Sequence, residues 1–125
     1  LVGSEMCIRD SVNGELTLGE NIGDLGGLSI AYKAWKTAQE KKDRPDSESV
    51  DGYTPAQRLF ISWAYVWQEK SRDEALKTRI ATDPHSPAEF RAVQTPRNVD
   101  AFYEAFDVKD SDGMWLPEEE RVAIW

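Results

Sequence analysis

The chain has 125 residues, of which 40% are hydrophobic and 10% aromatic, enough to bury the core of one ordinary domain. Its net charge of -8 would repel nucleic-acid phosphates and anionic lipid. No apolar run approaches the roughly 18 residues of a transmembrane helix, so we expect this segment to contact neither nucleic acid nor membrane.

The first eleven residues differ from the rest of the chain. Residues 1–11 show neither the alternation of a strand nor the apolar stripe of a helix, and they resemble the translation of a sequencing adaptor. We therefore treat them as non-native and assign residues 12–125 to one domain segment that continues upstream. The single cysteine, Cys7, excludes an internal disulfide, so cysteine usage does not indicate a compartment.

From Val12 onward, helix start signals predict a mainly α fold. Thr17 and Glu20 form a capping box, which predicts a helix from Thr17 to about Lys41, after a short extended piece over residues 15–18.

A second capping box at Thr54–Gln57 has proline at the first helical position. The helix that it starts places large apolar side chains on one broad face, which predicts that this face is buried. These residues are Leu59, Phe60, Trp63, Ala64 and Trp67. Shorter helices are predicted from Ser71 to about Asp83, from Ser86, from Asn98 through Phe106, and from Pro117.

The first predicted helix carries two carboxylates one turn apart. Glu20 and Asp24 share one strip of the helix, next to an apolar strip that contains Leu25 and Leu28. The glycine pair at 26–27 weakens a helix interior by about 1 kcal/mol per residue, which predicts close approach by another helix. The spacing alone favours a plain interpretation, a cap and a solvated acid. The functional alternative is a metal ligand with an outer-shell carboxylate.

The only histidine of the chain, His85, immediately precedes the short helix that carries Arg91. Taken alone, both residues are typical of surface or packing positions. A Ser-His-Asp arrangement of Ser86, His85 and Asp83 is a poor hypothesis, because immediate sequence neighbours point apart and no oxyanion hole is evident.

Two sequence strings carry a stronger signal. Residues 12–28, V-N-G-E-L-T-L-G-E-N-I-G-D-L-G-G-L, resemble the third zinc-ligand motif of the neprilysin family of zinc metallopeptidases, N-G-x-x-T-x-G-E-N-I-A-D-x-G-G. Only Gly23 departs from this core, where the family usually has alanine. Residues 83–91 resemble the family segment D-x-H-S-P-x-x-F-R, and residues 114–125 resemble the end of bacterial members. The resemblance thus covers roughly residues 12–125.

The resemblance implies the helical C-terminal part of a thermolysin-like (gluzincin) catalytic domain, truncated. It implies that Glu20 is a zinc ligand and that Asp24 is the outer-shell acid that holds a ligating histidine. By the same resemblance, His85 would stabilise the oxyanion of the tetrahedral intermediate, and Arg91 would bind a backbone carbonyl of the peptide substrate.

Family members bind one Zn²⁺ per catalytic domain through two further histidines of an H-E-x-x-H helix, whose glutamate is the general base. A chain with one histidine lacks that helix, so we expect this segment alone neither to hold zinc tightly nor to cleave peptides. Its partners would be peptide substrates and the missing N-terminal half of the same protein. We expect exposed apolar surface for that half around Leu25, Leu28 and Trp63.

The family further implies an extracytoplasmic location, as a periplasmic, secreted or membrane-anchored form. The alternative function is a non-catalytic helical module whose aromatic faces dock a partner, or a degenerate pseudo-peptidase. An upstream H-E-x-x-H helix would favour the enzyme over both.

Overall fold

The computed structural model describes residues 12–42 and 49–124, and this part of the chain is helical. The helices are α2 (Gly14–Lys41), α3 (Pro55–Val66), α4 (Asp73–Thr82), α5 (Ala88–Gln94) and α6 (Asp100–Phe106), with short 3-10 turns η1 (Pro96–Asn98) and η2 (Glu118–Glu120). The described residues form no strand beyond one isolated bridge between Val50 and Tyr53, which confirms the mainly α prediction. The prediction for residues 1–11 lies outside the described residues.

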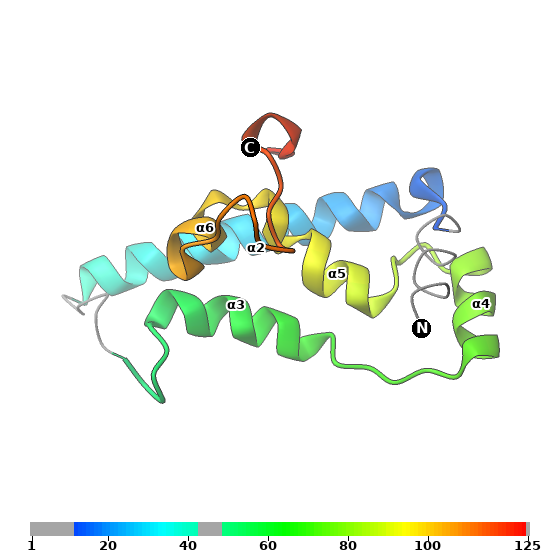
Figure 1. The fold of residues 1–125 in the computed structure, drawn as a ribbon, viewed down its shortest axis with the longest axis horizontal. Helices are drawn as coiled ribbons and strands as arrows, with labels where there is room; N and C mark the ends of the chain where they lie inside the picture. The colour runs from blue at the N-terminus through cyan, green and yellow to red at the C-terminus, as the bar shows by residue number, and fades with distance from the viewer. Residues whose placement is uncertain (1–11, 43–48, 125) are drawn as a thin grey trace.

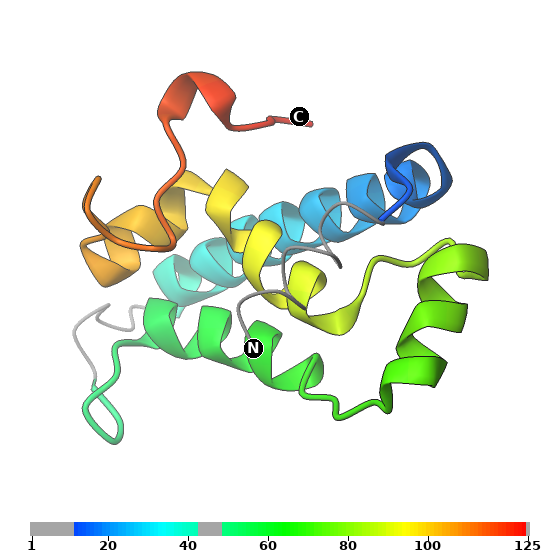
Figure 2. The same ribbon diagram turned by 45° about the vertical axis from the view of Figure 1, so that its right-hand side comes forward.

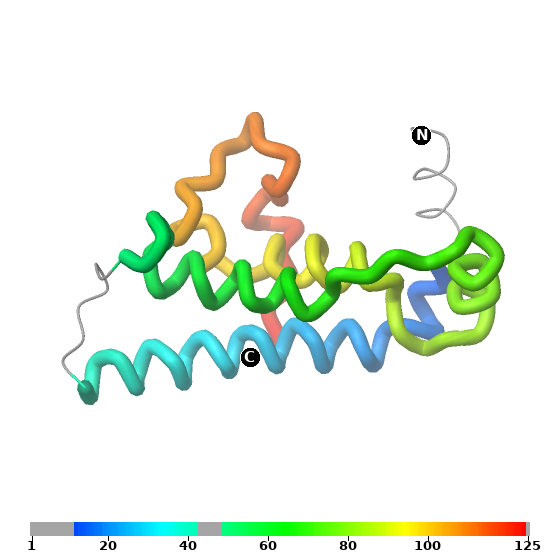
Figure 3. Tube along the Cα trace, turned by 90° about the horizontal axis from the view of Figure 1, so that it is seen from below, coloured from blue at the N-terminus to red at the C-terminus, as the bar shows by residue number. Residues whose placement is uncertain are grey.

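The long helix α2 lies beside α3 along the length of the molecule, and the two run in opposite directions (Figure 1). Seen from below, α5 and α6 lie along α3, and α4 stands at the end where α2 begins (Figure 3). Helix α3 contacts both α5 and α6, and η1 contacts α2. None of the described helices has the length and apolar content needed to cross a bilayer.

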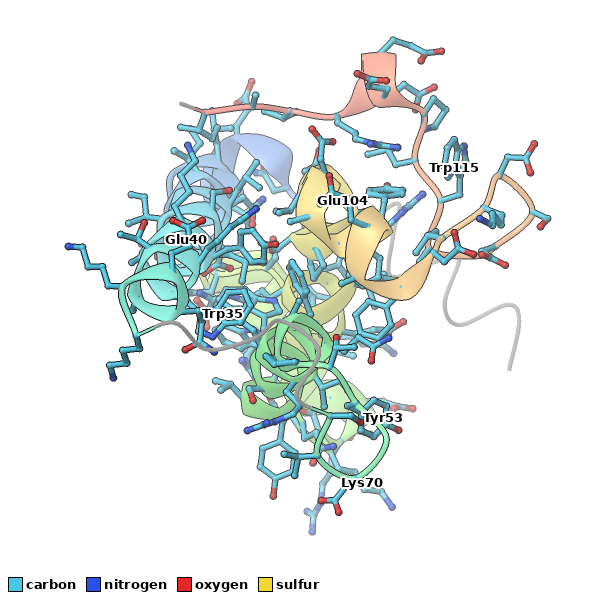
Figure 4. The ribbon with its side chains drawn as sticks, turned by 90° about the vertical axis from the view of Figure 1, so that its left-hand side faces the viewer. Trp35, Glu40, Tyr53, Lys70, Glu104 and Trp115 are labelled. Carbon is cyan, nitrogen blue, oxygen red and sulfur yellow. The ribbon has the colours of Figure 1, made fainter. Side chains whose placement is uncertain are left out.

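An aromatic cluster holds the second half of α2 against α3 and α6. Phe60 of α3 is only 2% exposed, and its ring lies 5.8 Å from that of Tyr32 on α2 and 5.5 Å from that of Phe102 on α6. Such rings bury large areas and dominate the energy of a small core. In Figure 4, Trp35 lies on the side of α2 that faces α3, while Trp115 lies on the segment that follows α6.

Helix α2 begins one turn earlier than the sequence predicts. Asn13 is its N-cap, and the Asn13 Oδ1 accepts hydrogen bonds from the backbone N–H groups of Glu15 (3.0 Å) and Leu16 (3.2 Å). Thr17 lies inside the helix, so both the Thr17 cap and the extended piece at 15–18 are wrong. Asparagine caps a helix as well as threonine does, and here it comes first along the chain.

The second predicted capping box is confirmed at the start of α3. Thr54 Oγ1 accepts from the Gln57 backbone N–H at 3.2 Å, and Gln57 Oε1 accepts from the Thr54 backbone N–H at 2.9 Å. Later starts are shifted: α6 is capped by Val99, and the side chain of Asn98 instead accepts from the backbone N–H of Val122 at 2.8 Å. That bond ties the C-terminal segment to the helices.

The apolar surface lies elsewhere than predicted. Leu25 and Leu28 are buried and Trp63 is half-buried, because these residues pack within the chain's own core. The close approach predicted for the glycine pair is also wrong at Gly27, where an added Cβ would meet no described atom within 4 Å. The exposed large apolar side chains of α2 and α3 are Leu16, Leu18, Ile22, Ile30, Ile61, Tyr65 and Val66.

Candidate active site

The first half of α2 faces the segment that joins α4 to α5 and the start of α5 (Figure 2). This arrangement brings together side chains more than 60 residues apart in sequence. His85 Nε2 lies 3.2 Å from Glu20 Oε2. Arg91 Nε lies 2.6 Å from Asp24 Oδ2, and Arg91 Nη2 lies 2.7 Å from Asp24 Oδ1. The four residues singled out in the sequence therefore form two contacting pairs. The α2 member of one pair, Glu20, lies one helical turn before the α2 member of the other, Asp24.

The Asp24–Arg91 pair is well shielded from solvent. The Asp24 side chain is 10% exposed and that of Arg91 is 15% exposed, and the guanidinium meets both carboxylate oxygens. The hydrogen bond to Asp24 raises the pKa of Arg91, against the opposing effect of burial. A guanidinium with this partner keeps its charge and a fixed plane.

Trp63 of α3 and Trp67, the residue that directly follows α3, also hold Arg91, and the sequence interpretation missed this role. The Arg91 Cζ lies 3.9 Å from the ring centroid of Trp67, and Trp63 Nε1 donates a 3.0 Å hydrogen bond to the Arg91 carbonyl oxygen. The stacked ring adds a cation–π attraction. The spacing of the two tryptophans by one turn was the available signal, and it was assigned only to the core.

His85 lies between two carboxylates. Its Nδ1 is 2.8 Å from Asp83 Oδ1, opposite the contact of Nε2 with Glu20. The His85 backbone N–H donates to the same Asp83 oxygen at 2.9 Å, and this bond, followed by the ring contact, holds the pKa of Asp83 below its ordinary value. Asp83 therefore orients the imidazole, a role that the sequence interpretation missed. In an Asx turn, the side chain of an aspartate accepts a hydrogen bond from the backbone N–H two residues later, as Asp83 does here.

The Ser86 hydroxyl does not approach His85 as a triad nucleophile would. It donates instead to Asn21 Oδ1 on α2 at 2.8 Å. This contact agrees with the rejection of a Ser-His-Asp arrangement, but the expectation that these neighbours point apart holds only for Ser86, because the Asp83 carboxylate contacts the His85 ring.

Glu20 fits the role of one zinc ligand. Its side chain is 48% exposed at the surface of α2, and carboxylate oxygens are among the ligands that zinc binds in proteins. Each Asp24 oxygen that accepts from Arg91 retains a second lone pair, which suits an outer-shell bond to a ligating histidine. The described residues contain no cluster of three histidine, cysteine or acidic side chains placed to hold a metal ion, so further ligands would have to come from elsewhere.

An open cavity of about 300 Å³ flanks the first half of α2. It lies between α2, α5 and the C-terminal segment, and most of its lining is apolar. Among the lining residues are Leu18, Ile22, Leu25, Phe90, Val122 and Ile124. This open apolar surface is therefore suited to contact with another apolar element.

Comparison with known proteins assigns the chain to a family. The model of peptidase family M13 matches residues 3–122. The chain is 40% identical over 114 residues to the neutral endopeptidase of Lactobacillus helveticus, covering 91% of this chain and 16% of that protein. It is 39% identical over 116 residues to human endothelin-converting enzyme 1, covering 93% of this chain and 15% of that protein.

A solved structure agrees in both sequence and fold. The zinc metalloprotease Zmp1 of Mycobacterium tuberculosis, solved in an inhibitor complex, superposes with a TM-score of 0.85 at 49% identity. The match covers 91% of this chain and 17% of Zmp1, so the chain spans about a sixth of the length of the relatives it matches. The family resemblance predicted from residues 12–28 and 83–91 is thereby confirmed, and the chain belongs to peptidase family M13, the family of the neutral endopeptidases and neprilysins.

Proposed function

We propose that this chain supplies the third zinc ligand and the transition-state-binding side of the active site of a zinc metalloendopeptidase. One observation carries the proposal: Glu20 and His85 lie 3.2 Å apart, beside an Arg91 fixed by Asp24, on one face of α2. Such a group of charged side chains from distant parts of the sequence is typical of a catalytic site rather than of a solvated surface.

Glu20 is the metal ligand in this proposal, and the other two ligands are histidines of an H-E-x-x-H helix elsewhere in the full-length protein. Asp24 accepts a hydrogen bond from one of those histidines and holds its ring in place. Zinc, when bound, supplies the Lewis acidity that activates water for attack on a peptide carbonyl. One Zn²⁺ per complete domain is expected, and the segment alone binds it weakly because it offers only one ligand.

His85 and Arg91 act on the peptide. Attack on the scissile carbonyl places negative charge on its oxygen, and an imidazole donor held by Asp83 would stabilise that charge. Arg91 presents planar N–H donors from a fixed position and would bind a backbone carbonyl of the substrate, which sets the register of the peptide.

The rest of the same protein is the proposed partner of the exposed apolar side chains on the first half of α2. Leu18 and Ile22 are 57% and 39% exposed and line the cavity between α2, α5 and the C-terminal segment. These side chains lie about 160° around α2 from Glu20, so a part of the protein other than the helix that brings zinc-ligating histidines to Glu20 would cover them. We propose peptides as substrates and an extracytoplasmic location for the full-length protein, in line with the family.

The test is peptide hydrolysis by the full-length protein and by the 125-residue chain, with and without a zinc chelator. We expect the full-length protein to cleave a peptide, to lose activity with the chelator and to regain it with Zn²⁺, while the 125-residue chain is inactive. Chelator-insensitive cleavage would contradict zinc catalysis. A full-length protein that binds peptide without cleaving it would favour the pseudo-peptidase instead.

A further inference from the structure

A line of polar side chains runs along α2 next to the proposed site. Asn13, Thr17 and Asn21 follow one another at four-residue spacing, so they lie on one strip of the helix. The Ser86 hydroxyl donates to Asn21 Oδ1 (2.8 Å), the Asn21 amide donates to Thr17 Oγ1 (3.3 Å), and the Thr17 hydroxyl donates to the Asn13 carbonyl oxygen (3.1 Å). The three bonds form one directed chain from the α4–α5 segment to the first turn of α2.

The two hydroxyl groups of this hydrogen-bond chain are buried, although Asn21 between them is exposed, and the Glu20–His85 pair that the chain flanks is half-exposed. Ser86 is 5% exposed and Thr17 is 3% exposed. The side chains of Glu20 and His85 are 48% and 42% exposed. An exposed ion pair contributes little to holding its own geometry, because solvent screens it and both side chains lose entropy. A buried hydroxyl deprived of its partner is costly, so the bonds made by the Ser86 and Thr17 hydroxyls define the geometry more strongly.

The hydrogen bond between Ser86 and Asn21 joins two residues that each follow a residue of the proposed site in the sequence. Asn21 directly follows Glu20, and Ser86 directly follows His85. The Ser86–Asn21 hydrogen bond thus joins α2 to the α4–α5 segment one residue after Glu20 and one residue after His85, and it holds both backbones near the Glu20–His85 contact. The amide orientation is determined too, because the Asn21 oxygen accepts from Ser86 while its nitrogen donates to Thr17.

We propose that the Thr17–Asn21–Ser86 chain is a positioning device for the reaction, which sets the place of the His85 imidazole relative to the Glu20 carboxylate. This inference rests on the proposed function, since the positioning matters only if His85 acts on the substrate. Ser86 acts through His85 and touches no substrate, so its effect on turnover must pass through the imidazole.

A double-mutant cycle in the full-length peptidase tests this dependence. We expect Ser86→Ala to lower kcat about tenfold, since small displacements of a positioned group cost this much or more. We expect His85→Ala to lower it about a hundredfold, as for the loss of one oxyanion donor. The double variant should match His85→Ala within about twofold, because no imidazole remains to be positioned. Losses that multiply in the double variant would overturn the proposal.

A second measurement reads the geometry directly and needs no activity. His85 is the only histidine of the 125-residue chain, so its ring protons give isolated NMR signals. We expect a nuclear Overhauser effect between the His85 ring and the Glu20 side chain in the wild type. It should persist in Ser86→Thr, which keeps the hydroxyl, and vanish in Ser86→Ala. An effect of undiminished strength in Ser86→Ala would refute the positioning role.

Thr17 supplies an independent variant with a matched control. Thr17 and Thr37 both lie on α2 and both donate to the carbonyl four residues before them, but only Thr17 continues to Asn21. Thr17→Val should weaken the His85–Glu20 effect and lower kcat, while Thr37→Val should change neither. Equal behaviour of the two variants would contradict the proposal. An inactive full-length protein would instead refute the proposed function, and the NMR measurement would still decide whether Ser86 positions His85.

Discussion

The two halves of α2 differ in what holds them to the rest of the chain. The second half packs through Leu28 and Tyr32 on an aromatic core that includes Phe60 and Phe102. The first half is held instead by directed polar bonds to residues 83–91, with apolar side chains left exposed beside them. One helix therefore provides a rigid support in one half and presents chemical groups in the other.

This difference explains how a small chain can carry an exposed, charged site. Burial of Leu28 against α3 and α6 fixes the direction of α2, because the apolar area removed from water stabilises the packed arrangement. Glu20 lies about two turns away on the same rigid rod, so its position follows from packing that it does not share.

Truncation of one apolar residue in each half should give the largest contrast. Leu28→Ala should lower the free energy of unfolding by about 3 kcal/mol, because Leu28 is 3% exposed and leaves a cavity. Ile22→Ala should change it by less than about 0.5 kcal/mol, since Ile22 is 39% exposed. Denaturant unfolding of the 125-residue chain measures both. Similar losses would show that the two halves are packed alike.

Neutralising one carboxylate of each charged pair should give the next largest effect. Asp24→Asn should cost about 2 kcal/mol, because it leaves the shielded guanidinium of Arg91 without its anionic partner. Glu20→Gln should leave stability within about 0.5 kcal/mol, since its contact with His85 is half-exposed. The comparison uses the same unfolding assay. A Glu20→Gln loss as large as that of Asp24→Asn would show that the Glu20 site supports the fold.

Removal of the α3 cap should weaken the supporting half by a smaller amount. Thr54→Ala eliminates the hydroxyl that accepts from the Gln57 backbone N–H and should cost about 1 kcal/mol. Its control is Thr78→Ala on α4, where an exposed hydroxyl bonds only the carbonyl one turn earlier. A thermal melt that distinguishes neither variant from the wild type would argue against a structural role for the α3 capping box.

The smallest effect concerns pH and the turn at Asp83. Its folded pKa lies below the ordinary value of 3.8, so the stability it contributes is fully present above that value and is lost as the pH falls through the lower folded pKa. Asp83→Asn should therefore melt below the wild type at pH 5 to 7, and the difference should disappear in strong acid. A difference in melting temperature that grows as the pH falls would contradict a lowered pKa for Asp83 in the folded chain.

Local signals predicted much of the fold. The box at Thr54–Gln57 was found because both partners lie within four residues. The Thr17 cap failed because Asn13 satisfies the first turn earlier, a competition between two good caps that spacing cannot decide. The prediction of exposed apolar surface around Leu25 and Leu28 was wrong, because only tertiary packing shows that these residues meet the aromatic core.

The site could be predicted as residues but not as contacts. Glu20, Asp24, His85 and Arg91 were found through their motifs. Their pairing depends on the approach of α2 to residues 83–91, which no local pattern contains. The roles of Trp63 and Trp67 at Arg91 were missed because an aromatic stripe on a helix is equally typical of a core.

Zinc binding by the full-length protein tests the central claim most directly. Equilibrium dialysis of the wild type, Glu20→Gln and the control Glu15→Gln would compare their Zn²⁺ dissociation constants; Glu15 lies exposed in the first turn of α2. If Glu20 is a zinc ligand, Glu20→Gln should raise the dissociation constant at least a hundredfold, about 2.7 kcal/mol, while Glu15→Gln leaves it unchanged. Equal zinc affinity in all three proteins would contradict the assignment of Glu20 as a zinc ligand.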